Sequence, residues 1–235
     1  MDHFNYRNGQ LYAEDVSVAE IATSVGTPFY VYSTATLVRH FQLFDEALDG
    51  MDHCICYAMK AASNQAILKT LGNLGAGMDV VSGGEYRRAL SAGIPPEKVV
   101  FSGVGKTLEE ITLALKNGIR QFNVESDSEL EQISSIASSM DKIAPIAVRI
   151  NPDVDAKTHE KIATGKAENK FGIPLSRARE VYSKASQMPG INIVGIDLHI
   201  GSQLTDLKPF KKAYQKLADL TQVLRQDGHK IKRLD

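Results

Sequence analysis

Cys54-Ile55-Cys56-Tyr57-Ala58-Met59-Lys60 is an apolar run that ends in a lysine. Its β-type residues lack a helical period, which predicts a strand covered on both faces that opens into a loop at Lys60. A lysine with little water around it loses its proton more easily, and its neutral amine can attack a carbonyl. A lone lysine at a strand end is usually just solvated, so the role of Lys60 depends on what the rest of the chain places beside it.

Composition limits the classes of function. The chain has 235 residues, 43% of them hydrophobic and 23% charged, with a net charge of −1, which is ordinary for a globular protein. No basic cluster is interleaved with aromatics, so nucleic acid is not an expected partner. The start lacks the apolar core of a signal peptide, and no apolar stretch approaches the ~18 residues of a membrane span. We therefore expect a cytoplasmic protein without a membrane partner.

The two cysteines of the chain are Cys54 and Cys56. Two residues apart on one expected strand, their side chains face the same way, but that geometry does not favour a bridge. No Cys or His spacing indicates zinc. We expect reduced core residues.

Beyond a leading segment, short apolar runs alternate with amphipathic stretches at intervals of roughly 20 to 25 residues, the rhythm of parallel βα units. We expect strands over 54–59, 76–81, 98–101, 121–124, 145–150, 193–200 and from 231. The expected helices cover 64–74, 84–92, 108–117, 127–139, 176–187 and 209–226. A long polar loop is expected over 151–174, and loops of that length are usually functional or disordered.

Polar residues follow each of the six complete strands. They are Lys60; Asp79 and Ser82; Ser102 and Gly103; Glu125; Arg149 and Asn151; and His199, Gly201 and Ser202. In a (β/α)8 barrel such ends converge on one rim, where active sites lie, whereas an open doubly wound sheet has its crevice at a single switch point. The pattern favours a barrel, incomplete here at about six strands plus the start of a seventh.

The segment Ser102-Gly103-Val104-Gly105-Lys106-Thr107 looks like a phosphate loop but fails both glycine patterns, which require glycine at Val100 or at Leu108. We interpret it as a strand-to-helix turn. Three pairs have capping-box spacing, namely Ser82 with Glu85, Thr107 with Glu110 and Ser126 with Glu129. These residues have a structural task at helix starts.

Asp79 and Arg149 lie in otherwise apolar strands, where a charge is costly unless it is compensated. A structural ion pair and a site role are both open for them, and a polar mouth shared with Lys60 would explain both. His199 offers a flat ring, and the turn Gly201-Ser202 offers backbone N–H groups and a hydroxyl to a phosphate. An amine, a flat neighbour and a nest of donors are what pyridoxal 5'-phosphate requires.

The chain also resembles the N-terminal portion of the diaminopimelate decarboxylase family, alanine-racemase-like enzymes that depend on pyridoxal phosphate and have a TIM-type barrel. The resemblance covers nearly the whole chain. Two blocks are specific to this family within its class, Asn-Pro-Asp-Val-Asp-Ala-Lys-Thr-His over 151–159 and Asn-Lys-Phe-Gly-Ile over 169–173. Further matching blocks are 27–32, 57–61, 77–85, 101–107, 122–126, 164–166 and 199–204.

The resemblance implies that Lys60 is the catalytic residue, bonding to the cofactor aldehyde, and that cofactor-binding residues surround it. It implies that His199 stacks on the pyridine ring, that Gly201 and Ser202 meet the phosphate, and that Asp79 and Arg149 line the pocket. The implied reaction is decarboxylation of meso-2,6-diaminopimelate to L-lysine, in a homodimer acting on a small amino acid. Residues 28–235 would form the partial barrel, and 1–27 a segment that packs on a C-terminal β-domain.

The chain departs from the family pattern in two places. Ala62 stands where the family has asparagine. The family's triple-glycine phosphate loop and its Glu-Pro-Gly-Arg segment would both follow Asp235. Because six strands cannot close a barrel and the acid that pairs with the pyridine nitrogen is in that later segment, we expect residues 1–235 alone to be inactive. The alternatives are an ornithine or arginine decarboxylase, disfavoured by the block 169–173, and a non-catalytic homologue that binds the cofactor or dimerises.

Overall fold

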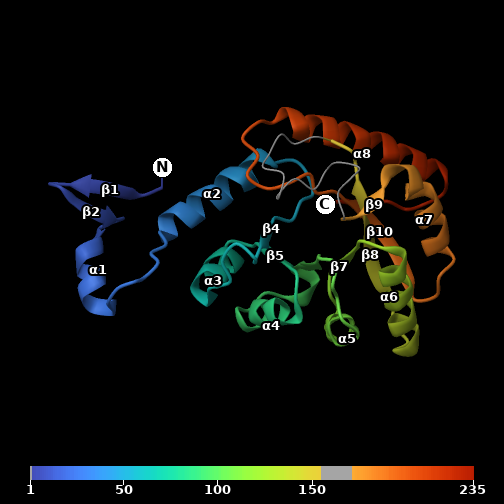
Figure 1. Cartoon of the computed structure of the whole chain (residues 1–235), viewed down its shortest axis with the longest axis horizontal. Helices are drawn as coiled ribbons and strands as arrows, with labels where there is room; N and C mark the ends of the chain where they lie inside the picture. Colours follow the sequence, from blue (N-terminus) through green and yellow to red (C-terminus); the bar gives the residue numbers. More distant parts are fainter. Residues whose placement is uncertain (1, 155–170) are drawn as a thin grey trace.

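A curled parallel sheet forms the centre of the computed structural model, which describes residues 2–154 and 171–235 (Figure 1). Its strands lie in the spatial order β4 (Cys56–Ala58), β5 (Gly77–Val80), β6 (Val99–Phe101), β7 (Gln121–Val124), β8 (Ala144–Asn151), β10 (Ile191–Asp197) and β11 (Arg233–Leu234). All of these pairings are parallel. The sheet is half of a barrel, which confirms the predicted six strands and the start of a seventh.

Helices follow the strands and cover the outer face of the sheet (Figure 1). They are α3 (Gln65–Asn73), α4 (Gly83–Ser91), α5 (Leu108–Asn117), α6 (Asp127–Ser139), α7 (Ala178–Ser186) and α8 (Lys208–Gln226), with short 3-10 turns at Pro96–Lys98 and Leu175–Arg177. The predicted helices are confirmed to within two residues at each end. No helix in the described part of the chain is long and apolar enough to cross a membrane.

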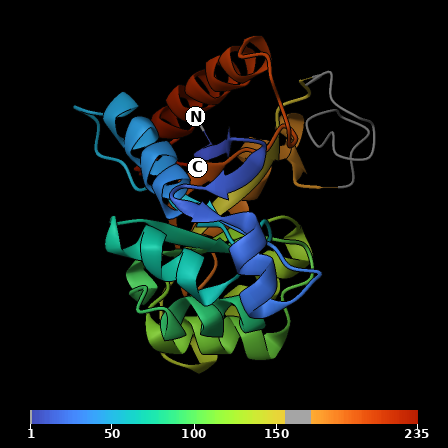
Figure 2. The ribbon, with the colours of Figure 1, turned by 90° about the vertical axis from the view of Figure 1, so that its left-hand side faces the viewer.

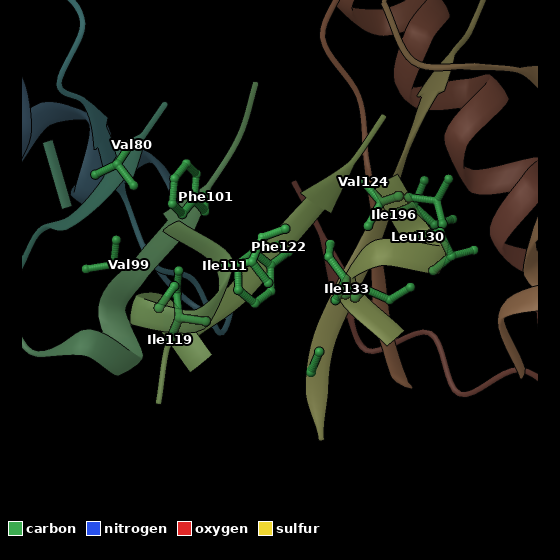
Figure 3. Packing of buried hydrophobic residues seen from close by; sticks show 14 of the residues in the cluster. Val80, Val99, Phe101, Ile111, Ile119, Phe122, Val124, Leu130, Ile133 and Ile196 are labelled. Carbon is green, nitrogen blue, oxygen red and sulfur yellow. The ribbon is translucent and has the colours of Figure 1, made fainter. Parts of the chain in front are cut away.

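The two faces of the sheet differ in polarity because successive side chains of a strand point to opposite faces. The outer face packs apolar side chains against the helices, as Figure 3 shows for Val80, Phe101, Phe122, Val124 and Ile196. The alternate positions carry polar groups on the inner face, among them Asp79, Ser102, Asn123, Arg149 and Asp197. A polar lumen and an apolar outer layer therefore result from the same strands.

Four of the six complete strands are shorter than predicted, namely β4, β5, β6 and β10. β4 begins at Cys56, so that Cys54 precedes it, and β10 ends at Asp197, where its pairing with Arg149 of β8 ends as well. His199 therefore lies in the segment after the strand. The loop predicted over 151–174 lies mostly outside the described residues, and its end forms the short strand β9 (Ile173–Pro174), which pairs with β8.

Of the three predicted capping boxes, the Thr107–Glu110 pair alone forms in full. Ser82 and Ser126 do accept the backbone N–H three residues on. The carboxylates of Glu85 and Glu129 accept instead from the residue before the cap, Val81 N and Glu125 N, each at 2.8 Å. Both serines have a more extended backbone, with φ near −155° against −82° for Thr107. The backbone N–H of each serine is therefore turned away from the glutamate carboxylate three residues on.

The leading segment forms elements that the sequence analysis did not assign. β1 (Phe4–Arg7), β2 (Gln10–Ala13) and β3 (Val16–Ser17) make an antiparallel sheet, followed by α1 (Val18–Val25) and α2 (Thr34–Ala47). Sheet and α1 lie to one side of the half-barrel (Figures 1 and 2). The Glu14 carboxylate ties them to the start of α2, since it accepts hydrogen bonds from Ser33 Oγ at 2.7 Å and Ala35 N at 2.8 Å.

Candidate active site at the carboxyl ends of the strands

Lys60 lies in the turn that follows β4, and its side chain is exposed, so the expectation that little water surrounds its ammonium group was wrong for the described part of the chain. The turn is closed by Ala61 N, which donates to Ala58 O at 3.1 Å, and by Met59 N, which donates to Asp79 O on the neighbouring strand at 3.0 Å. Tyr57 Oη donates to Ala62 O at 3.2 Å. The backbone of Ala62, the residue that departs from the family pattern, thus helps to hold the turn that presents Lys60.

Asp79 points into the lumen from β5. It accepts a hydrogen bond of 2.6 Å from Ser102 Oγ. Burial raises the pKa of Asp79 to about 6, the Asp235 charge adds to the increase, and the Ser102 hydrogen bond and the Lys60 charge oppose it. The carboxyl group therefore titrates close to neutral pH, within the electrostatic range of Lys60.

Two further acids in the lumen were not predicted as site residues. Asp235 Oδ2 accepts from Gln121 Nε2 at 3.0 Å and from Asn123 Nδ2 at 3.1 Å. Burial and the Asp235 charge raise the pKa of Asp197 well above its usual range. Asp197 could have been predicted from the sequence, because it is an acid inside an apolar strand, as Asp79 is.

Arg149 is held by Glu125, the residue at the end of β7. Its Nη1 donates to Glu125 Oε1 at 2.9 Å, and Gly103 N donates to the same oxygen at 3.0 Å. The guanidinium lies over the Phe171 ring, 5.5 Å from the centroid. The Glu125 side chain is 2% exposed, and its Oε2 is buried with no hydrogen-bond partner in the described part of the chain. The ion pair considered for Arg149 therefore exists, and it orients the cation at the rim.

Lys106, in the loop first compared with a phosphate loop, is fully buried. Its ammonium donates to Glu129 Oε1 at 2.6 Å, Gly103 O at 2.7 Å and Asn123 O at 2.8 Å. All three of its protons are therefore used inside the protein. The interpretation as a strand-to-helix turn agrees with this geometry, and Lys106 fastens the loop to β7 and α6.

His199, Gly201 and Ser202 lie together in the segment after β10. The His199 ring is half-buried, and burial lowers its pKa to about 4, with the Arg149 and Lys60 charges acting in the same direction. The ring is therefore neutral at pH 7. Gly201 has φ 132°, a conformation that favours glycine, and it turns the chain so that Ser202 is exposed.

The predicted site residues thus come from different strands to one edge of the half-barrel. Electrostatic effects connect Lys60 to both Asp79 and His199, and Arg149 to His199. No group of three or more His, Cys, Asp or Glu residues that could hold a metal ion occurs among residues 2–154 and 171–235. The arrangement offers an amine, an acid, an oriented cation and a neutral flat ring, which fits an aromatic aldehyde with a phosphate group.

Known proteins resemble the chain along its whole length. It is 53% identical over 235 residues to the diaminopimelate decarboxylase of Haemophilus influenzae, covering 100% of this chain and 57% of that protein. The Pseudomonas aeruginosa diaminopimelate decarboxylase is 48% identical, with the same coverage. The chain therefore spans a little over half the length of these curated relatives.

Solved structures agree with the fold. The crystal structure of Helicobacter pylori diaminopimelate decarboxylase complexed with L-lysine superposes with a TM-score of 0.90 at 45% identity, covering 92% of this chain and 55% of that one. Lysine decarboxylase from Selenomonas ruminantium gives 0.82 at 25% identity. Residues 34–235 match the family described as pyridoxal-dependent decarboxylase, pyridoxal binding domain. The chain belongs to this family of pyridoxal-dependent decarboxylases.

Proposed function

We propose that the whole protein decarboxylates meso-2,6-diaminopimelate to L-lysine and carbon dioxide with pyridoxal 5'-phosphate as cofactor. The observation that carries the proposal is the rim itself, where Lys60 lies in the electrostatic range of Asp79 and His199 at the carboxyl ends of a half-barrel. The relatives named diaminopimelate decarboxylase at about half identity support the substrate. The complex of the Helicobacter pylori enzyme with L-lysine supports the product.

Lys60 is the residue we assign to the cofactor aldehyde. It is exposed at the rim, with no hydrogen bond to its ammonium group among the described residues. A catalytic amine must be able to lose its proton and reach a carbonyl. Lys106, which lies in the loop after β6, is buried and already donates three hydrogen bonds. The contrast supports Lys60 over Lys106.

Asp79 and His199 would control protonation around the cofactor ring. With a pKa of about 6, Asp79 can both hold and release a proton near neutral pH, and its Ser102 hydrogen bond fixes its orientation. The neutral His199 ring can stack on an aromatic ring without adding positive charge to the site. Both roles follow from burial at the inner face.

Arg149 and the Gly201-Ser202 turn would bind the oxygen atoms of the cofactor. Glu125 holds the Arg149 guanidinium in one orientation, so its remaining N–H groups can donate to an anionic oxygen. The turn at Gly201 and the exposed Ser202 hydroxyl supply donors of the kind that bind phosphate. When bound, pyridoxal phosphate supplies an aldehyde and an electron-withdrawing ring that accepts the electron pair left by carbon dioxide.

The described half-barrel leaves both edge strands, β4 and β11, paired on one side only. Lys60 follows one of these edges and Asp235 the other. A site that opens on unpaired edges admits water and holds its groups loosely. For this reason we also propose that residues 1–235 alone do not turn over substrate. We further propose that the whole protein is a homodimer, as the family resemblance implies.

A decarboxylation assay tests the proposal. The whole protein with pyridoxal phosphate should release carbon dioxide from meso-diaminopimelate, and the Lys60→Ala variant should lose at least about a thousandfold in kcat, as expected for removal of a covalent catalyst. Faster release of carbon dioxide from L-ornithine or L-arginine would show that one of these amino acids is the substrate instead of meso-diaminopimelate. Cofactor binding without any release of carbon dioxide would show that the protein binds the cofactor but is not a decarboxylase.

Two controls belong to the assay. Lys69→Ala, on the exposed side of α3, removes a lysine of the same unit and should leave the rate unchanged. Single-turnover decarboxylation by residues 1–235 at the rate of the whole protein would contradict the expected inactivity of the isolated chain. Size-exclusion chromatography with light scattering tests the dimer.

A further inference from the structure

Cys54 and Cys56 lie at the opposite end of β4 from Lys60. Their sulfur atoms are 3.9 Å apart, and both residues are free thiols and half-buried. The sequence analysis placed both on one strand, where the spacing does not favour a bridge. In the structure Cys54 precedes β4 and is not part of the pairing between β4 and β5, which begins at Cys56. It can therefore move relative to Cys56 without breaking the pairing of the sheet.

Gly77 makes the space for the two sulfur atoms. It pairs with Cys56 in the register of β4 and β5. A Cβ at this position would lie 2.2 Å from Lys98 O and 2.9 Å from Cys56 Sγ, closer than real contacts allow, and a tight 3.3 Å from Cys54 Sγ. The pair therefore packs against bare backbone, and no side chain of β5 separates the thiols from each other.

Charged groups from neighbouring elements surround the pair. Those with an electrostatic effect on it are Lys98, Arg120, Arg233 and Asp235. The contact with Cys56, together with the Arg120 and Lys98 charges, holds the pKa of Cys54 well below its usual range. The same contact and burial raise the pKa of Cys56. The Cys56 thiol also donates to the Lys98 carbonyl oxygen at 3.9 Å. A cysteine with a lowered pKa beside one with a raised pKa is the combination found in reactive pairs.

We propose that Cys54 and Cys56 form a redox-active dithiol that hydroperoxides oxidise to an intramolecular disulfide. The Cys54 thiolate attacks the terminal peroxide oxygen, the O–O bond breaks, and the leaving oxygen departs as hydroxide or alkoxide and is protonated from water. The Cys56 sulfur then attacks the resulting sulfenic acid, an S–S bond forms, and the hydroxyl leaves with the Cys56 proton as water. The pair loses two electrons and the peroxide gains them.

The final step requires the sulfur atoms to approach from 3.9 Å to about 2.05 Å. The movement falls on Cys54, because Cys56 is held in the ladder with Gly77. A thiol such as dithiothreitol reverses the bond by exchange, with two protons and two electrons returned to the pair. This site is independent of the proposed decarboxylation.

The experiment uses the fully reduced chain and hydrogen peroxide. Because the chain has two cysteines, thiol titration and intact mass report on this pair without further mapping. We expect loss of both thiols, a mass decrease of two hydrogen atoms, and full reversal by dithiothreitol. Oxidised methionines add oxygen instead and do not revert with dithiothreitol, so they are distinguished.

Two serine variants test the assigned roles. Cys56→Ser should stop at the sulfenic acid of Cys54, which dimedone traps, at a rate within about threefold of the unmodified chain. Cys54→Ser should react at least about tenfold more slowly, because burial still disfavours the thiolate of Cys56 when Cys54 is gone. Circular dichroism confirms that both variants are folded. Equal rates for the two variants, disulfides between chains, or thiols that survive excess peroxide would each overturn the proposal.

Discussion

Two lysines that follow strands of the same sheet, Lys60 after β4 and Lys106 after β6, have opposite surroundings. Lys106 has a side chain that is 0% exposed, an ion pair with Glu129 and two backbone acceptors. Lys60 is exposed at the rim and lies near an acid that titrates close to pH 6. The same residue type therefore fastens the barrel in one place and is available for chemistry in the other. The difference lies in the partners that the fold provides, and it can be tested by removing them.

Replacing Lys106 should have the largest effect on stability. Lys106→Met leaves Glu129 buried without its cation, and burial already raises the pKa of this carboxyl group. Breaking such a pair costs about 3 to 5 kcal/mol of unfolding free energy, which urea denaturation measures. The control is Lys184→Met, whose partner Glu131 is exposed, and it should cost at most about 1 kcal/mol.

The double variant Lys106→Met/Glu129→Leu separates loss of the pair from loss of packing. Since both charges are then gone, it should be more stable than Lys106→Met alone. If Lys106→Met unfolds with the same free energy as the unmodified chain, Lys106 does not fasten the loop and the contrast with Lys60 fails.

The acid beside Lys60 should make stability depend on pH. The pKa of Asp79 is about 6 in the folded chain against a usual value of 3.8, so the folded chain binds this proton more tightly. Ionisation therefore costs stability as the pH rises from about 4 to 6. Asp79→Asn should be more stable than the unmodified chain at pH 7 by about 2 to 3 kcal/mol and equal to it below pH 4.

Asparagine keeps an oxygen that can accept the Ser102 hydrogen bond, so this change removes the charge and little else. Asp219→Asn on the exposed side of α8 is the matched control and should change neither pH region. An Asp79→Asn chain that is less stable at pH 7 would show that the charge is compensated in the fold.

The smallest effect concerns the helix start next to Lys106. Thr107→Ala removes the hydroxyl that accepts from Glu110 N, leaves the bond from Thr107 N to Glu110 in place, and should cost about 1 kcal/mol. Thr112→Ala in the same helix, where the hydroxyl bonds only to Leu108 O, should change the unfolding free energy by less than about 0.5 kcal/mol. Equal costs for the two would mean that the loop is held by Lys106 alone.

Much of the rim could be predicted from sequence, because the βα alternation and the polar residue at each strand end are local signals. The fold then brings Lys60, Asp79, Arg149 and His199 to one edge. Contacts between distant residues could not be predicted. Glu129 follows Lys106 by 23 positions, and nothing in the loop sequence indicates that this lysine is buried.

Features that depend on the folded backbone and on distant contacts also explain the other predictions that failed. Capping spacing placed Glu85 and Glu129 correctly at their helix starts, but the extended backbone of the caps decided which N–H each carboxylate accepts. The sheet of β1 to β3 was not assigned, because its strands are short and its ties to α2, through Glu14 and His3, are contacts between distant residues.

In the proposed function, Lys60 is the residue that binds the cofactor aldehyde. Borohydride reduction of the protein in the presence of pyridoxal phosphate, followed by peptide mapping, tests this directly. We predict one pyridoxyl group per chain, on Lys60, absent from Lys60→Ala and retained in Lys106→Met. Labelling of Lys106, or labelling that persists at another lysine in Lys60→Ala, would contradict it.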